Sequence, residues 1–127
     1  MNKKHILFSL ALFAVVLLGC NKKLDTVARI TVYNSLDSKV VSDCRVVLWG
    51  KAGVGPGSQD QGDVVIYDTA YTNSVGEAVF YYNELYQKGT AGVAILQIEA
   101  KKGNYNGSGI IKVEEETTNE AVVYIQP

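Results

Sequence analysis

The stretch Val93–Lys101 reads VAILQIEAK and alternates between two sets of side chains. One set is uniformly apolar and comprises Ala94, Leu96, Ile98 and Ala100. The other set is mixed and comprises Val93, Ile95, Gln97 and Glu99. Successive side chains of a β-strand point to opposite sides of a sheet, so this alternation predicts a strand with one buried face. A slip of one residue would expose the apolar set, and the sequence therefore specifies the register of this strand.

Similar stretches recur along the chain. They are rich in Val, Ile, Tyr and Thr, and Gly, Asn, Asp and Ser separate them. The predicted strands are Thr26–Tyr33, Asp43–Gly50, Asp63–Thr72, Glu77–Tyr82, Val93–Lys101, Ser108–Glu115 and Glu120–Gln126. No long window has a helical period. Strands of this number and spacing predict an all-β sandwich or barrel, formed as one domain by residues 26–127.

The connections between these strands carry turn signals. Asn73–Gly76 predicts a tight turn, and Asn104–Gly107 predicts a second hairpin connection in which Asn106 and Gly107 take positive φ. The longest predicted loop is the glycine-rich segment Lys51–Gly62, and Asn83–Gly92 has room for one helical turn.

The first twenty residues, MNKKHILFSLALFAVVLLGC, have the organisation of an export signal. Lys3 and Lys4 precede an apolar run of about 13 residues, which is too short to span a bilayer comfortably. Its end, LLGC at residues 17–20, resembles the lipobox of bacterial lipoproteins. That resemblance implies a signal-peptide helix over residues 1–19, cleavage before Cys20, and lipid on the Cys20 sulfur and amine. The alternatives are an ordinary secretory signal and an uncleaved membrane anchor.

Residues 20–25 then form a predicted tether. Lys22 and Lys23 lie either in solvent or on anionic headgroups, where each contributes roughly 1 kcal/mol. Charged residues just after the cysteine also resemble the surface-export signals of Bacteroidota lipoproteins. The chain is therefore expected in the cell envelope, held by its lipid on either face of the outer membrane rather than on the inner membrane.

Composition excludes several classes of function. Removing Lys3 and Lys4 leaves ten of the twelve basic residues against thirteen acidic ones, and no basic stripe indicates a nucleic-acid partner. The only histidine, His5, belongs to the signal, so the mature chain has no Ser-His-Asp or Cys-His arrangement and no histidine-ligated metal. No cofactor or metal is predicted.

With Cys20 lipidated, Cys44 is the one remaining cysteine of the sequence. It is either a buried core thiol, which the alternation with Val46 and Leu48 favours, or an intermolecular link.

The order of the motifs resembles the carboxypeptidase regulatory-like domains, which share a transthyretin-like sandwich with Cna-B repeats. The resemblance covers most of residues 26–127 and rests on KVVSDCRVVL (39–48), YTNSVGEAVF (71–80), the strand at 94–102 and the closing strand at 121–125. It implies a single Ig-like or transthyretin-like antiparallel β-sandwich of about seven strands. Members of the family are commonly non-catalytic stalks, adhesion modules or accessory domains. The chain departs from the pattern at Cys44, where a small residue is usual, and at Asn104, which interrupts the Gly-Tyr pair.

Acidic residues form one cluster, Glu114–Glu116 with Glu120. On a strand, Glu114 and Glu116 would share a face. Three interpretations are open: a solvated strand end that resists edge pairing, a cation site, and a carboxylate pair for glycoside hydrolysis. Asp60, Asp63 and Asp68 flank the predicted loop without the ligand density of a calcium site, and the nearby glycines lack the ending of a phosphate loop.

Tyrosine is abundant: the chain has eight, all after Cys20. Tyr67, Tyr71 and Tyr82 are the candidates for an exposed binding face, because tyrosine offers a large amphipathic contact area. The competing interpretation is ordinary strand composition. The sequence thus predicts a lipid-anchored, non-catalytic envelope module that binds a protein or a glycan. The alternatives are a structural subunit of a pilus, adhesin or other assembly that uses strand addition, and a small carboxylate-based hydrolase.

Overall fold

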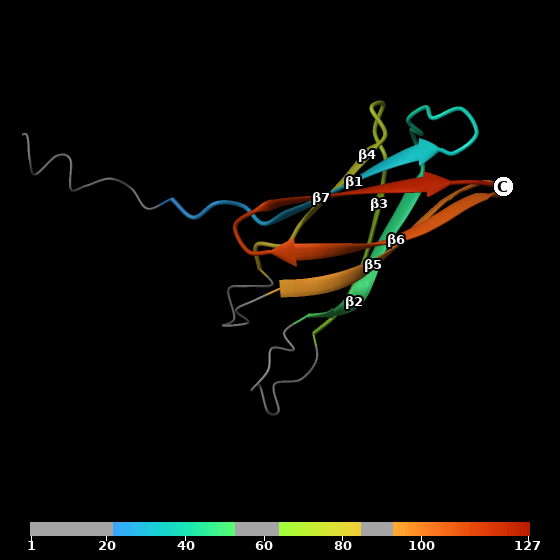
Figure 1. The fold of residues 1–127 in the computed structure, drawn as a ribbon. Coiled ribbons are helices and arrows are strands. Elements are labelled where there is room, and N and C mark those ends of the chain that lie inside the picture. The colour runs from blue at the N-terminus through green and yellow to red at the C-terminus, as the bar shows by residue number, and fades with distance from the viewer. Residues whose placement is uncertain (1–21, 53–63, 85–92) are drawn as a thin grey trace, which may run out of the picture.

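A computed structural model describes residues 22–52, 64–84 and 93–127, and these form seven strands in two facing sheets (Figure 1). The strands are β1 (Val27–Asn34), β2 (Arg45–Ala52), β3 (Val64–Tyr71), β4 (Glu77–Tyr81), β5 (Val93–Lys102), β6 (Tyr105–Glu114) and β7 (Thr118–Ile125). The predicted all-β sandwich is confirmed. The predicted signal helix, Cys20 and most of the predicted long loop and helical turn lie outside the described residues. Lys51 and Ala52, predicted as loop, continue β2 instead.

The strand order is β4-β1-β7 in one sheet and β3-β2-β5-β6 in the other. All neighbours are antiparallel except β1 and β7, which run parallel from Val27↔Thr118 to Asn34↔Ile125. The expectation of a fully antiparallel sandwich is therefore wrong at this pair. The reason is the short turn after β6, which returns the chain at the end of the domain where β1 begins. We call this the tether end, and the opposite end, where β1 and β7 finish, the far end.

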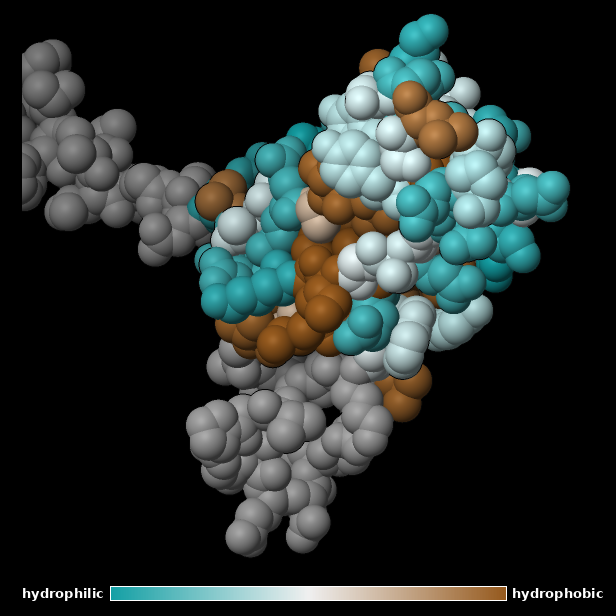
Figure 2. All heavy atoms as spheres, turned by 45° about the vertical axis from the view of Figure 1, so that its right-hand side comes forward, coloured by the Kyte–Doolittle hydropathy of each residue, from teal (hydrophilic) through white to brown (hydrophobic). Residues whose placement is uncertain are grey.

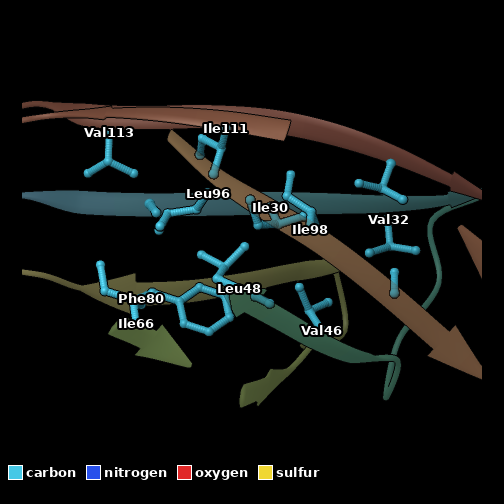
Figure 3. Packing of buried hydrophobic residues seen from close by; sticks show 14 of the residues in the cluster. Ile30, Val32, Val46, Leu48, Ile66, Phe80, Leu96, Ile98, Ile111 and Val113 are labelled. Carbon is cyan, nitrogen blue, oxygen red and sulfur yellow. The ribbon is translucent and has the colours of Figure 1, made fainter. Parts of the chain in front are cut away.

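The core lies between the two sheets and follows the alternation in the sequence. Ile30, Leu48, Leu96 and Ile98 interdigitate there and are almost completely buried (Figure 3). Their removal from water is the main favourable term for folding. The predicted inner set of Val93–Lys101 is buried in full, so the register inferred from that stretch is confirmed.

Two predicted turns have different outcomes. Asn73–Gly76 is a tight turn as predicted: the Asn73 side-chain oxygen accepts hydrogen bonds from the amides of Val75 and Glu77, and Gly76 has φ 77°. The second predicted hairpin connection, at Asn104–Gly107, is wrong in position. Lys102 pairs with Tyr105 across a two-residue turn in which Gly103 has φ 58°, and Gly107 lies inside β6.

Within the described residues, no helix has the length and apolar character needed to cross a membrane.

Candidate functional site

The solvent side of the four-stranded sheet, which we call the outer face, gathers aromatic residues from separate strands. Strand pairing places Trp49 of β2 between Tyr67 of β3 and Gln97 of β5, and Gln97 lies opposite Ile110 of β6. With strands about 4.8 Å apart, this row of side chains crosses about 14 Å of surface. Val47 lies on the same face, two residues before Trp49 on β2. It is only 2% exposed, so longer side chains beside it on this face cover it.

Exposed apolar and aromatic side chains cluster on the half of the outer face near the tether end, which we call the apolar half. They belong to all four strands: Trp49, Val65, Tyr67, Val93, Ile95 and Ile110. The charged Lys112 and Glu114 lie beside them on β6. A scattered exposed hydrophobic residue needs no explanation, but a contiguous group of them is typical of an interaction surface. On the face that it draws, Figure 2 shows hydrophobic side chains gathered in a continuous band with hydrophilic side chains on both sides.

The three tyrosines predicted to form a binding face do not all lie together. Tyr67 and Tyr71 share the outer face on β3 and are both exposed. Tyr82 does not belong to this face: it is 6% exposed and packs in the core, where its ring stacks near Phe80. The alternation of β4 explains the difference, because Tyr81 points to solvent and its neighbour must point inward. Burial and the nearby Asp68 carboxylate raise the pKa of the Tyr82 phenol well above its ordinary value.

The half of the outer face near the far end is polar. Glu99 and Lys101 of β5 lie opposite Ser108 and Asn106 of β6, and with β7 they line a hollow of about 480 Å³. No sequence pattern predicted this hollow, because its residues come from separate strands and form no motif.

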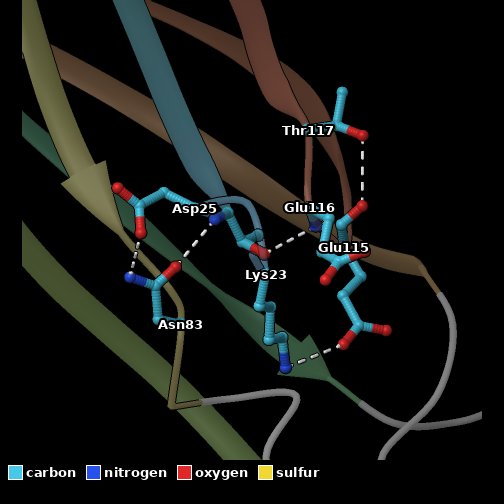
Figure 4. A network of polar contacts seen from close by, with 7 residues as sticks. Lys23, Asp25, Asn83, Glu115, Glu116 and Thr117 are labelled. Atoms are coloured by element: carbon cyan, nitrogen blue, oxygen red, sulfur yellow. Dashed lines mark hydrogen bonds and ion pairs between the residues drawn. The ribbon is translucent and has the colours of Figure 1, made fainter. Parts of the chain in front are cut away.

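The acidic cluster is not a paired-carboxylate site. β6 ends at Glu114, and Glu116 follows in the turn with φ 55°, so the two side chains do not share a strand face. Glu114 forms an ion pair with Lys112 at 3.0 Å, and Glu115 forms one with Lys23 at 3.3 Å (Figure 4). Among the residues that the structure describes, no three His, Cys, Asp or Glu side chains come together to hold a metal ion. Asp60 and Asp63 lie outside those residues.

Polar contacts also hold the start of the domain in place. The amide of Thr26 donates to the Asn83 side-chain oxygen at 2.7 Å, and Asn83 donates to Asp25 at 2.9 Å. The Thr26 hydroxyl accepts from the Glu116 amide at 2.8 Å (Figure 4). The predicted tether therefore leaves the domain from a fixed point at the tether end.

Cys44 is a fully buried free thiol, as the alternation favoured. Burial raises its pKa above the ordinary value, which disfavours the reactive thiolate. An intermolecular disulfide at Cys44 would require the core to open.

Comparison with protein-family models and with curated proteins finds no match to this chain. The resemblance to carboxypeptidase regulatory-like domains and to lipoproteins therefore stays a prediction, and function must be argued from the surface itself.

Proposed function

We propose that this protein is a lipid-anchored, non-catalytic module of the bacterial outer membrane that binds a protein partner through the apolar half of its outer face. The proposed anchor rests on the sequence LLGC at residues 17–20 after a short apolar run. The absence of histidine after residue 5 supports a binding role rather than a catalytic one.

The observation that carries the binding proposal is the pairing of Trp49 with Tyr67 across two neighbouring strands. Their exposed fractions are 46% and 66%, so both rings present large areas to solvent. Trp and Tyr dominate the binding energy of many protein interfaces, particularly where they lie side by side at the centre of the contact.

The aliphatic neighbours of this pair favour a protein over a glycan. Val65, Ile95 and Ile110 have no hydrogen-bonding groups with which to recognise sugar hydroxyls. Lys112, Glu114 and Glu99 lie on the same face around the apolar residues, and an apolar centre with a charged rim is the usual anatomy of a protein interface. Because the apolar half is near the tether end, the partner would be another protein at the same membrane.

The test is site-specific photo-crosslinking in intact cells. A benzoylphenylalanine at position 67 is expected to crosslink one protein, seen as a single species of higher mass, which mass spectrometry then identifies. Tyr81 is the matched control, because it is 67% exposed but lies on the other sheet. Equal crosslinking from both positions, or none from position 67, would refute the proposed face.

The anchor has its own test. Full-length protein is expected in the detergent phase after phase partitioning, with the mass of a lipidated N-terminus, and Cys20→Ala should move it to the aqueous phase. A Cys20→Ala variant with unchanged partitioning and mass would refute lipidation.

The edge position of β3 supports a second candidate, a structural subunit assembled by strand addition. Among the strands that the structure describes, β3 has a neighbour on one side only, and it presents Val65, Tyr67 and Tyr71 to solvent. An unpaired strand edge is a template for another chain. In the crosslinking experiment this function predicts a ladder of species at multiples of the chain's own mass.

A further inference from the structure

The polar hollow lies where β5, β6 and β7 meet at the far end of the domain. Its lining comes from three strands: Glu99 and Lys101 of β5, Asn106, Gly107 and Ser108 of β6, and Tyr124 together with Gln126, which directly follows β7. Its volume of about 480 Å³ is within the range of small-molecule sites, roughly 300–1,000 Å³.

Backbone contacts fix the shape of this hollow. Gly107 lies against β7 so closely that a Cβ atom there would overlap the carbonyl oxygen of Tyr124. Beside it, the backbones of Asn106 and Gln126 exchange two hydrogen bonds, both of 3.0 Å. The strands thus fix the backbone positions from which the Asn106 and Gln126 side chains project, so the backbone needs no further ordering when a ligand binds.

An aromatic platform forms one wall. Tyr124 is 57% exposed, and its ring stacks on that of Tyr33, with ring centroids 5.7 Å apart. Because Tyr33 supports it from one side, the Tyr124 ring is held in place while still presenting apolar area to solvent. Such a surface suits the apolar C–H face of a sugar ring.

The remaining walls offer hydrogen-bonding groups without net charge. Asn106 and Gln126 each carry a donor and an acceptor, Ser108 adds a hydroxyl, and Glu99 and Lys101 cancel in charge. Within the described part of the chain, the side chains of Asn106, Ser108 and Gln126 make no hydrogen bond with other residues, so their polar groups are free for a ligand. A site with balanced charge favours neither an anion nor a cation. Side-chain amides and hydroxyls both donate and accept hydrogen bonds, and sugar hydroxyls can therefore pair with them in either role.

We propose that this hollow binds a short segment of a neutral glycan, with one sugar ring on Tyr124 and its hydroxyls on Asn106 and Gln126. The site shares only Glu99 with the rim of the apolar half of the outer face, and the proposal does not depend on that half. If the proposed lipid anchor holds the tether end at the membrane, the hollow lies at the end of the domain away from the bilayer, where soluble or wall glycans are accessible.

The test is titration of the full-length protein in detergent micelles with neutral oligosaccharides, monitored by isothermal calorimetry. The probes are hexasaccharides of glucose, mannose and xylose in different linkages, with hexagalacturonate as the charged comparison. At least one neutral probe is expected to bind, and Tyr124→Ala and Asn106→Ala should each raise its Kd about tenfold, a loss of about 1.4 kcal/mol.

Two controls distinguish this site from other surfaces. Tyr81→Ala removes a similarly exposed tyrosine from β4, which is at the opposite edge of the three-stranded sheet from Tyr124 on β7. Tyr67→Ala removes an exposed tyrosine from the apolar half of the outer face. Both should change the Kd less than twofold. The proposal is overturned if no neutral probe binds, if only the charged probe binds, or if Tyr124→Ala leaves the affinity unchanged. Since all of the substituted side chains are exposed, thermal unfolding of each variant should match the parent protein.

Discussion

The side-chain amide of Asn119 donates a 3.1 Å hydrogen bond to the carbonyl oxygen of Val27, a residue 92 positions earlier in the chain. The same nitrogen donates to the carbonyls of Glu114 and Thr117, and the side-chain oxygen accepts from the Glu114 amide. One buried side chain therefore joins the end of β6, the turn and the beginning of β1. This contact connects the two sheets at the point where the domain leaves its tether.

Replacing Asn119 with Ala should destabilise the fold by about 2–3 kcal/mol, because the buried partners of its side chain would lose their hydrogen bonds. Urea unfolding followed by circular dichroism measures the change in the free energy of unfolding. Asn104→Ala, in the exposed turn between β5 and β6, is the control and should cost much less. A similar loss in both variants would contradict the role assigned to Asn119.

A second prediction concerns the contact between β6 and β7. Gly107→Ala should cost at least about 2 kcal/mol, because the added methyl group overlaps the backbone of Tyr124. Gly109 is on the same strand and face, but a Cβ there meets only side-chain atoms, of Val123 at 3.3 Å and of Ile98 at 3.6 Å, and side chains can shift. Gly109→Ala should therefore remain within about 1 kcal/mol of the parent protein. Thermal unfolding of the two variants measures the difference, and equal melting temperatures would contradict the close approach.

The Cys44 thiol should be unreactive in the folded protein. It is completely buried and its pKa is raised, so both access and thiolate formation are suppressed. Iodoacetamide at pH 8 is expected to leave it unmodified over an hour and to label it stoichiometrically in 8 M urea, as read by intact mass. Rapid labelling without denaturant would show that Cys44 is accessible.

Stability should fall at alkaline pH, partly through Tyr82. In the unfolded chain its phenol ionises near its ordinary pKa of 10, whereas in the folded protein burial and Asp68 keep it protonated. The stabilising contribution is thus present below pH 10 and is lost as the pH rises further, by about 1.4 kcal/mol at pH 11. Tyr82→Phe removes this dependence.

Urea unfolding at pH 8 and pH 11 tests the role of Tyr82. The loss of stability between the two values should be smaller in Tyr82→Phe than in the parent protein. Tyr81→Phe, at an exposed position, should behave like the parent protein. Identical pH dependence in the parent protein and Tyr82→Phe would exclude a contribution from Tyr82.

Sequence patterns predicted the strands well because each strand's burial repeats every two residues, and that signal is local. Each predicted strand corresponds to an observed one, with ends that differ by up to three residues. The same alternation predicted the buried position of Cys44. Local turn residues predicted the turn at Asn73–Gly76. Turn residues misled at Gly107, where the need for glycine comes from a neighbouring strand and not from a turn.

The candidate sites were less predictable, since each depends on strands that meet only in three dimensions. Tyr67 and Tyr71 were identified from residue type, but Tyr82 was misplaced because the adjacent pair Tyr81-Tyr82 does not reveal which member points inward. No sequence motif or residue pattern indicated the hollow beside Tyr124. Its residues come from β5, β6 and the end of β7, and pairing between strands alone brings them together.

The sequence by itself determined that this chain forms short strands with one buried face, since alternation of apolar side chains leaves no other way to remove them from water. Only the tertiary structure decided how those strands are ordered, that β1 and β7 run parallel, and which exposed side chains share a surface. Strand order and direction depend on long-range backbone hydrogen bonds, which nearly any residue can make. Side-chain identity therefore predicts strand order and direction poorly.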